Sequence, residues 1–322
     1  MIARKVGPAL ASGCTFVGRP AEKTPLSALA MAVLGKRAGL PDGVLSIVPG
    51  QDAPALGLEL CTNPKVRKLT FTVSTEVGRI LMRQCAHDIK KLSLELGGNA
   101  PFLVFDDADL DKAVEGAIIA KYRNSGQTCV CANRIYVQRG VLDAFARKLV
   151  AATAQLKVGN GVEPGVSIGP LIDAEGLAKV EDHVGEALGK GARALVGGRR
   201  SALGGSFYEP TVLIGVKPGM KILREETFGP VSPIVAFDHD DEAIAMANDT
   251  EFGLASYFYT RDISRVWRVS EALEYGMVGI NTGLISTAEV PFGGIKSSGL
   301  GREGSKYGIE EFLEIKYLCM SI

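Results

Sequence analysis

The sequence predicts an α/β protein, and three observations lead to that class. Short apolar strand-like segments alternate with segments of helical apolar spacing along most of the 322 residues. Hydrophobic residues make up 46% of the chain and charged residues 22%, a balance that supports a large core. Glycine is in excess, with 39 of 322 residues, or about 12%, against a usual share of roughly 7%. This excess predicts many close approaches of backbone to backbone.

The first 97 residues have the pattern of part of a doubly wound layer, because strands separated by helices favour right-handed crossovers in a parallel sheet. The expected strands are 15–17, 44–48, 68–73 and 91–96, and the expected helices are 25–35, a short one after Pro49-Gly50, and 75–87. The first fourteen residues imitate a signal peptide, but Gly7 and Pro8 interrupt the apolar stretch. We therefore expect a helix there.

A second strand and helix series begins at Pro101, so the expected boundary is Gly97-Gly98-Asn99. Its expected strands are 102–105 and 134–138, its expected helices are 110–122, 141–156 and 174–190, and further alternation continues to Asn281. A Gly/Pro-rich loop is expected at 158–170 and a hairpin-like stretch at 196–208. With about 150 residues per domain, the length itself predicts about two domains.

Charge and cysteine content exclude several classes of protein. Lys plus Arg and Asp plus Glu both number 36, so neither nucleic acid nor an anionic membrane is an expected partner. The six cysteines have no framework spacing, which favours a reducing, cytoplasmic compartment. The three histidines are far apart and no Cys-x-x-Cys pair accompanies them, so no metal is expected. No apolar run approaches the roughly 18 residues of a membrane span.

Cys129, in the segment Gly126-Gln127-Thr128-Cys129-Val130-Cys131, is a candidate nucleophile. A cysteine in a turn that begins with glycine is sterically open, as a thiolate must be to attack a carbonyl carbon. The alternative is a small residue that fills a corner of the core, since cysteine is often buried.

Glu95, in Leu94-Glu95-Leu96-Gly97-Gly98-Asn99, is a candidate general base. A carboxylate inside an apolar strand end is desolvated, so its pKa should rise and it could accept a proton near neutral pH. The alternative is an ordinary glutamate at a strand end.

Together with Glu225-Glu226-Thr227-Phe228-Gly229-Pro230 and Pro291-Phe292-Gly293-Gly294-Ile295-Lys296, these segments resemble the aldehyde dehydrogenase superfamily. The motifs follow the family's order from Met1 to the C-terminus, and the nearest likeness is to the succinate-semialdehyde branch. The resemblance implies an incomplete doubly wound NAD-binding sheet in residues 1–97. It further implies an α/β catalytic domain in 98–300 and a C-terminal oligomerisation strand in 301–322, hence a homo-oligomer.

The resemblance also implies a mechanism. The Cys129 thiolate attacks the aldehyde, hydride leaves the thiohemiacetal for the nicotinamide, and water activated by Glu95 hydrolyses the thioester.

Five positions match the family's cofactor-binding residues: Arg19, Glu22, Ser74, Glu226 and Phe228. A carboxylate at the adenosine ribose would repel a 2′-phosphate, which favours NAD, although the cations beside Glu22 keep NADP possible. Val73 stands where the family has glycine, and its branched side chain is expected to crowd the dinucleotide.

Three positions match the residues that hold a distal carboxylate in the succinate-semialdehyde branch: Arg4, Arg123 and Ser286. Guanidinium groups suit planar, bidentate carboxylate binding. Cys131 resembles a redox partner that silences the nucleophile through a reversible disulfide. The alternative for Cys131 is an inert small residue in the loop.

Members of the family are longer at the N-terminus, and their preceding segment supplies an Asn donor of the oxyanion hole. Loss of one such donor costs roughly a hundred- to a thousandfold in rate. The sequence leaves three functions open: an oxidoreductase that converts succinate semialdehyde to succinate, a catalytically impaired member that acts as an interaction or oligomerisation partner, and a dehydrogenase for another small aldehyde.

Overall fold

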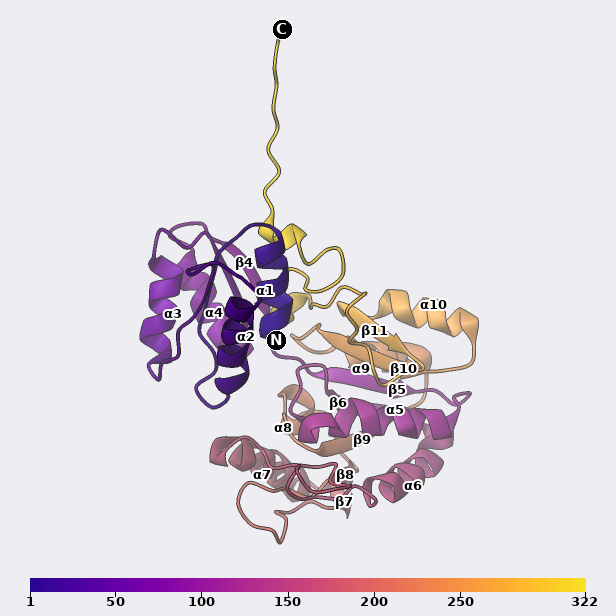
Figure 1. Cartoon of the computed structure of the whole chain (residues 1–322). Coiled ribbons are helices and arrows are strands. Elements are labelled where there is room, and N and C mark those ends of the chain that lie inside the picture. The colour runs from indigo at the N-terminus through magenta and orange to yellow at the C-terminus, as the bar shows by residue number, and fades with distance from the viewer. The chain divides into compact units, whose positions relative to one another are not determined.

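The computed structural model describes residues 1–322 and divides the chain into two compact units (Figure 1). Unit 1 comprises 1–96, 286–293 and 299–322, and unit 2 comprises 97–285 and 294–298. The sequence instead assigned all of 98–300 to one catalytic domain. The difference arises because the chain returns to unit 1 at 286–293 and again at Gly299, where a short strand pairs with a strand that ends at Glu95.

Unit 1 contains the helices and strands that the sequence predicted for its first 97 residues. They are α1 (Ile2–Ala11), β1 (Phe16–Gly18), α2 (Leu26–Arg37), β2 (Leu45–Ile47), α3 (Ala53–Thr62), β3 (Lys68–Thr72), α4 (Thr75–Cys85) and β4 (Lys91–Glu95). The strands form two sheets. β1 pairs with β2 in parallel, while β3 and β4 are parallel and β12 (Gly299–Leu300) adds to β4 in the antiparallel sense.

Local chemistry explains where the helices of unit 1 begin. The Asp52 carboxylate accepts the Ala55 N–H at 3.0 Å and caps α3. Ser74 caps α4 by accepting the Val77 N–H at 3.5 Å. A small core lies beneath α3 and α4 and is formed by buried side chains of Cys61, Leu69, Leu81 and Cys85.

Unit 2 is built on a seven-stranded sheet with the strand order β11-β10-β5-β6-β9-β8-β7. Its strands are β5 (Ala100–Val104), β6 (Ala132–Gln138), β7 (Arg193–Val196), β8 (Thr211–Ile214), β9 (Val231–Phe237), β10 (Ala255–Tyr259) and β11 (Met277–Ile280). Only the β7–β8 pair at one edge is antiparallel. Its helices are α5 (Leu110–Tyr122), α6 (Leu142–Thr153), α7 (Ala174–Gly189), α8 (Lys221–Arg224), α9 (Asp240–Asn248) and α10 (Ile263–Ala272).

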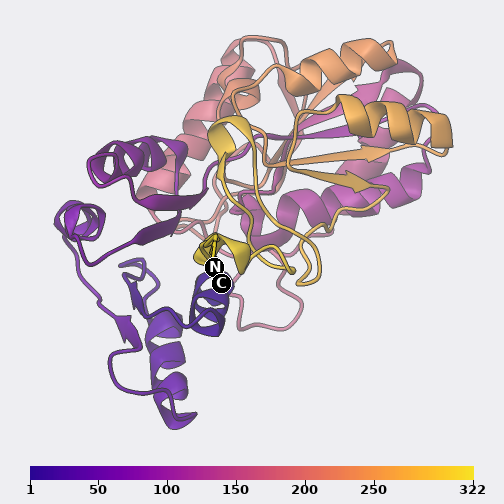
Figure 2. The same ribbon diagram turned by 90° about the horizontal axis from the view of Figure 1, so that it is seen from above.

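Helices cover both faces of this sheet (Figure 2). Leu103 and Phe105 alternate with Phe102 and Val104, and only the first pair joins the large core cluster that includes side chains of α7 to α10. The other face carries α5 and α6, which pack against each other and against β6. Burial on both faces explains the continuous apolar run of β5, as is usual in parallel sheets.

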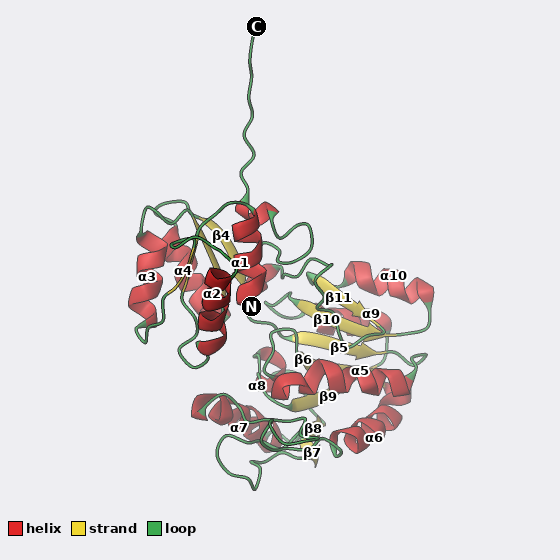
Figure 3. Cartoon of the chain, in the orientation of Figure 1, coloured by secondary structure: helices red, strands yellow, loops and turns green.

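The C-terminal tail does not form the strand that the apolar and polar alternation of 311–319 predicted. After the 3-10 helix η4 (Glu310–Phe312) the chain has no regular secondary structure (Figure 3). Ile315, Tyr317 and Leu318 are exposed by 80% or more. A strand needs hydrogen bonds from a neighbouring strand, and no segment of this chain provides them here.

No helix of the chain is both long enough and apolar enough to cross a bilayer.

Candidate active site

The turn that carries Cys129 is shaped by three consecutive residues in the left-handed region of the backbone. After α5 ends at Tyr122, Asn124, Ser125 and Gly126 have φ of 51°, 58° and 78°. Such a conformation costs about 1–3 kcal/mol at a non-glycine residue and persists only where the surroundings impose it. A Cβ at Gly126 would lie 2.2 Å from the Gly229 carbonyl oxygen, so no larger residue fits this position.

Cys129 itself is half-buried, within a turn in which the Cys131 N–H donates to the Thr128 carbonyl at 3.0 Å. Its backbone packs against Gly98, where an added Cβ would lie 2.3 Å from the Cys129 carbonyl oxygen. Gly98, in the predicted boundary, therefore leaves the space that the turn of the candidate nucleophile occupies.

Glu226 also contacts Gly98. Its Oε1 accepts the Gly98 N–H at 3.1 Å, so Glu226 and the Cys129 turn both contact the backbone of Gly98. Burial raises the pKa of Glu226 to about 7, and the Gly98 N–H opposes that rise. The structure thus brings together a predicted nucleophile and a predicted cofactor-binding carboxylate.

Phe228 lies two residues further on and has a φ of 54°, an uncommon value for a bulky residue. Thr227 before it is buried and Gly229 after it packs closely on Val180 of α7, where an added Cβ would meet the valine side chain at 2.4 Å. Phe228 itself is 36% exposed. Arg123, at the start of the 3-10 helix η1 (Arg123–Gly126), is also exposed.

Cys131 points into the core of unit 2. Its thiol is 1% exposed and donates to the Lys121 carbonyl at 3.4 Å, and burial raises its pKa. No disulfide is present among the six cysteines.

Glu95 occupies the last position of β4 in unit 1, between Thr72 of β3 and Gly299 of β12. It is 2% exposed, and its Oε2 has no hydrogen-bond partner. Burial raises its pKa to about 8, the negative charge of Glu303 adds to the rise, and Lys5 opposes it. The pKa shift predicted from the apolar surroundings of Glu95 is therefore found.

Sequence reasoning missed two residues around Glu95. Lys5 is buried on α1 and donates to Glu303 and, at 2.6 Å, to Thr72 Oγ1. Glu303 is buried as well. One signal for Lys5 is its place on the buried face of α1 beside Val6 and Ala9, where an apolar residue is expected. No local pattern distinguishes Glu303.

Arg4 and Ser286, 282 positions apart, meet in unit 1. Arg4 Nη2 donates to Ser286 Oγ at 2.5 Å, and the guanidinium carbon lies 4.2 Å from the centroid of the Phe292 ring. A guanidinium has five N–H donors, so this contact leaves others for an anion. The structure therefore brings together two of the three residues predicted to bind a carboxylate.

Two features of unit 1 fit a dinucleotide. Arg19 Nη2 donates to Glu22 at 2.7 Å and to the Gly50 carbonyl at 3.3 Å, while its buried Nε has no partner. An unpaired buried donor of this kind fits an oxygen acceptor such as a ribose or phosphate oxygen. The N-terminus of α4, capped by Ser74, offers backbone N–H groups that suit a phosphate.

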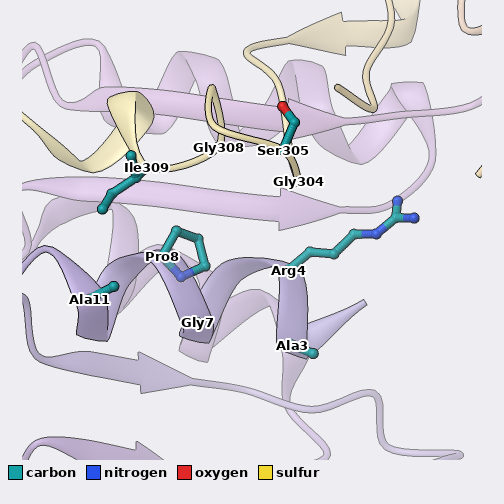
Figure 4. Close-up of a pocket in the computed structure, with 9 residues that line it drawn as sticks. All are labelled: Ala3, Arg4, Gly7, Pro8, Ala11, Gly304, Ser305, Gly308 and Ile309. Atoms are coloured by element: carbon teal, nitrogen blue, oxygen red, sulfur yellow. The ribbon is translucent and has the colours of Figure 1, made fainter. Parts of the chain in front are cut away.

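A cavity of about 430 Å³ lies in unit 1 between the outer side of α1 and the loop 304–309 (Figure 4). Its lining is largely apolar, and Arg4 is the only predicted site residue among those that line it. The Arg4 side chain extends away from it in Figure 4.

The predicted site residues are divided between the two units. Unit 1 carries Glu95, Arg4, Arg19, Glu22, Ser74 and Ser286, and unit 2 carries Cys129, Cys131, Arg123, Glu226 and Phe228. Across the whole chain, no group of three or more His, Cys, Asp or Glu side chains is placed to hold a metal ion.

Three features are typical of an oxidoreductase that works through a covalent intermediate. They are a cysteine turn packed against a glycine, a buried glutamate of raised pKa, and a helix N-terminus that suits the phosphates of a dinucleotide. The family model described as the aldehyde dehydrogenase family matches residues 1–318. The chain belongs to the aldehyde dehydrogenase family.

Individual relatives agree with that assignment. The chain is 66% identical over 320 residues to a glutarate-semialdehyde dehydrogenase of Pseudomonas aeruginosa, covering 99% of this chain and 66% of the relative. It is 64% identical to an NADP(+) succinate-semialdehyde dehydrogenase of Escherichia coli, covering 100% of this chain and 67% of the relative. The crystal structure of a succinate-semialdehyde dehydrogenase from Burkholderia pseudomallei is 64% identical, with a TM-score of 0.99 over 100% of this chain and 67% of that one. The chain thus spans about two thirds of the length of these relatives.

Proposed function

We propose that the protein oxidises an aldehyde to a carboxylic acid with a nicotinamide dinucleotide. The observation that carries this proposal is the Cys129 turn. Its backbone is strained and packs against Gly98, whose N–H is bound by Glu226, and its cysteine is half-buried. The Cys129 thiolate attacks the carbonyl carbon and forms a thiohemiacetal, which becomes a thioester as hydride leaves. The nicotinamide supplies the acceptor for that hydride.

Glu95 completes the cycle. In its ionised form it removes a proton from water, and the resulting hydroxide attacks the thioester, releasing the acid and regenerating the Cys129 thiol. A pKa of about 8 suits this role, because the group takes up and releases a proton close to neutral pH.

The proposed substrate class is a small aldehyde with an anionic group at its other end, with succinate semialdehyde as the particular substrate. The contact of Arg4 with Ser286 supports this class, because a guanidinium whose orientation is set by a hydroxyl and an aromatic ring is prepared for a carboxylate. Arg123, exposed six residues before Cys129, is proposed as the second cation. Succinate and glutarate semialdehydes, named in the relatives, differ by one methylene and share this distal carboxylate.

The proposed cofactor is NAD, with NADP also accepted. Glu22 at the adenosine ribose favours NAD, since its carboxylate would repel a 2′-phosphate. Its ion pair with Arg19 at 2.7 Å offsets that repulsion. NADP(+) appears in the name of the Escherichia coli relative, which supports keeping both dinucleotides in the proposal.

The exposed apolar residues of 315–322 support a further proposal, that the tail pairs with a second copy of the chain in a homo-oligomer. Ile315, Leu318 and Ile322 would then lose most of their exposed area, which stabilises association by roughly 25 cal/mol per Å² of apolar surface.

The substrate proposal is tested by kcat/KM for succinate semialdehyde, glutarate semialdehyde and uncharged butanal, each with NAD and NADP. We expect Arg4→Leu and Arg123→Leu to reduce kcat/KM for both semialdehydes at least tenfold while changing that for butanal little. Arg139→Leu, which removes a surface arginine paired with Asp238, is the matched control and should change neither. Equal losses for charged and uncharged aldehydes would contradict the assignment of the two arginines.

A further inference from the structure

His183 is the one histidine of the chain whose side chain is buried, and it lies on α7 against the loop that contains Glu226 and Phe228. Its exposure is 0%. Nδ1 lies 3.1 Å from Thr227 Oγ1 and Nε2 lies 3.2 Å from Glu225 Oε2. The imidazole therefore contacts the residues on both sides of Glu226 in the sequence.

The chemistry of these partners sets the tautomer of the ring. A carboxylate oxygen only accepts hydrogen bonds, so Nε2 carries the proton and donates to Glu225. Nδ1 then accepts the Thr227 hydroxyl proton. Burial lowers the pKa of His183, the carboxylate of Glu225 opposes that change, and the other charged side chains acting on the ring are Lys179 and Asp182 of α7. The neutral ring thus uses both of its nitrogens.

This double contact fixes the backbone of the loop where it is under strain. Phe228 has a φ of 54°, which the surroundings must impose, and Gly229 packs against Val180, one turn before His183 on α7. Side chains of adjacent residues in an irregular loop are free to rotate unless held. With Glu225 and Thr227 both held by one ring, the intervening Glu226 stays directed at the Gly98 N–H.

We propose that His183 is a positioning residue, which holds Glu225 and Thr227 so that the Glu226 carboxylate and the Phe228 ring keep the geometry that binds the dinucleotide. The inference rests on the proposed function, because it takes Glu226 and Phe228 as residues that bind the dinucleotide. It adds a residue that touches neither cofactor nor substrate and acts through two neighbours of the binding residues.

The test uses the full chain with His183→Leu, which fills a similar volume without polar atoms, and His183→Gln, whose amide can donate to Glu225 and accept from Thr227. Val184→Ala on the same helix is the matched control, because it shortens a core side chain next to His183 and removes neither hydrogen-bond partner of the ring. Titration with NAD and NADP should show a tenfold or greater increase in Kd for His183→Leu and a Kd for His183→Gln equal to that of the parent. The control should bind as the parent does, and KM for the aldehyde should change little in all variants.

Two spectroscopic measurements do not depend on the cofactor. Selective ¹⁵N labelling of histidine should show a protonated Nε2 and an unprotonated Nδ1 for the buried ring of the parent chain. Exchange of the Gly98 amide proton should be slow in the parent and the control, and at least tenfold faster in His183→Leu.

The outcomes separate the two claims. A parent chain that binds neither dinucleotide would refute the proposed function, while faster exchange at Gly98 in His183→Leu would still support positioning of Glu226. Unchanged exchange and unchanged dinucleotide affinity in a folded His183→Leu would overturn the role of His183 and leave the proposed function standing. If His183→Leu does not fold, His183→Gln decides the question. A Gly98 exchange rate and a Kd equal to those of the parent support the paired contacts, whereas an increase in both contradicts them.

Discussion

Replacing Glu95 by Gln is expected to stabilise the protein at alkaline pH. Burial and the charge of Glu303 raise the pKa of Glu95 from its ordinary value of 4.5 to about 8. The folded state therefore keeps a proton that the unfolded chain releases in this range, so stability contributed by that proton is complete below pH 4.5 and is lost as pH rises to about 8. Each pKa unit corresponds to about 1.4 kcal/mol, so the full loss is on the order of a few kcal/mol.

Glutamine has the shape of protonated glutamate but does not titrate, so the variant escapes this loss. The difference in free energy of unfolding between Glu95→Gln and the parent should be small at pH 5, grow with pH and level off above pH 8. Urea unfolding followed by circular dichroism at five pH values between 5 and 9 measures it, and titrating groups far from Glu95 cancel in the difference. Glu22→Gln is the control, because the pKa of Glu22 is lowered by backbone and Arg19 hydrogen bonds.

A difference that is the same at pH 5 and pH 9 would refute the argument, as would a variant that loses stability relative to the parent as pH rises. Activity gives a second readout. With a pKa of about 8, roughly one tenth of Glu95 is ionised at pH 7, so steady-state turnover should rise nearly tenfold towards pH 9. Glu95→Gln should keep a first burst of reduced dinucleotide and lose the fast turnover that follows.

Three further predictions concern the nucleophile, the cofactor and the tail. Cys129→Ser should abolish aldehyde oxidation with dinucleotide affinity retained, and turnover at the parent rate would exclude Cys129 as nucleophile. Val73→Gly should tighten dinucleotide binding and Glu22→Ser should shift preference towards NADP, as calorimetric titration of both dinucleotides will show; identical affinities in all three proteins would contradict the site. Deleting 315–322 should convert an oligomer to a folded monomer in sedimentation, whereas deletion from Glu311 should also cost stability, because Glu311 accepts from Ser93 at 2.7 Å; a parent chain that sediments as a monomer would argue against the tail proposal.

Much of the secondary structure was predictable because each element carries its own signal. The helix predicted over 110–122 matches α5 at both ends, since Asp109 caps it and the left-handed turn at Asn124 ends it. The strand predicted over 91–96 matches β4 to within one residue for a related reason, because Gly97-Gly98 stops the apolar run. Signals of this kind lie within a few residues of the element that they define.

The tail shows the limit of such patterns. Alternation of apolar and polar residues over 311–319 is a property of the segment, whereas a strand also requires hydrogen bonds from a neighbour. No strand of this chain lies beside 313–322, so the pattern alone did not produce the structure. The same reasoning applies to unit 1 as a whole, because only long-range pairing with β4 shows that Gly299–Leu300 belongs there.

Around the candidate site, sequence reasoning found the residues named in motifs and missed those that act on them. Glu95 was predicted to have a raised pKa from its apolar neighbours, but the charges of Lys5 and Glu303 come from 90 positions before it and 208 after it. His183 was noted only as one of three scattered histidines. Its contact with Thr227 spans 44 positions, a distance at which no local periodicity carries information.

The excess of glycine is explained at the site by two different physical needs. At Gly126 and Gly98 the need is space. A Cβ at Gly126 would lie 2.2 Å from the Gly229 carbonyl oxygen, and one at Gly98 would lie 2.3 Å from the Cys129 carbonyl oxygen. At Gly293 a Cβ would approach Glu95 Oε1 at 3.0 Å and the Gly301 carbonyl oxygen at 2.6 Å. Glycine at this position therefore lets the backbone pack closely against the Glu95 carboxylate, where water would otherwise have room. Exclusion of water is what raises the pKa of Glu95, because desolvation disfavours the charged form. Residues without side chains therefore determine both the shape of the nucleophile's turn and the basicity of the proposed general base.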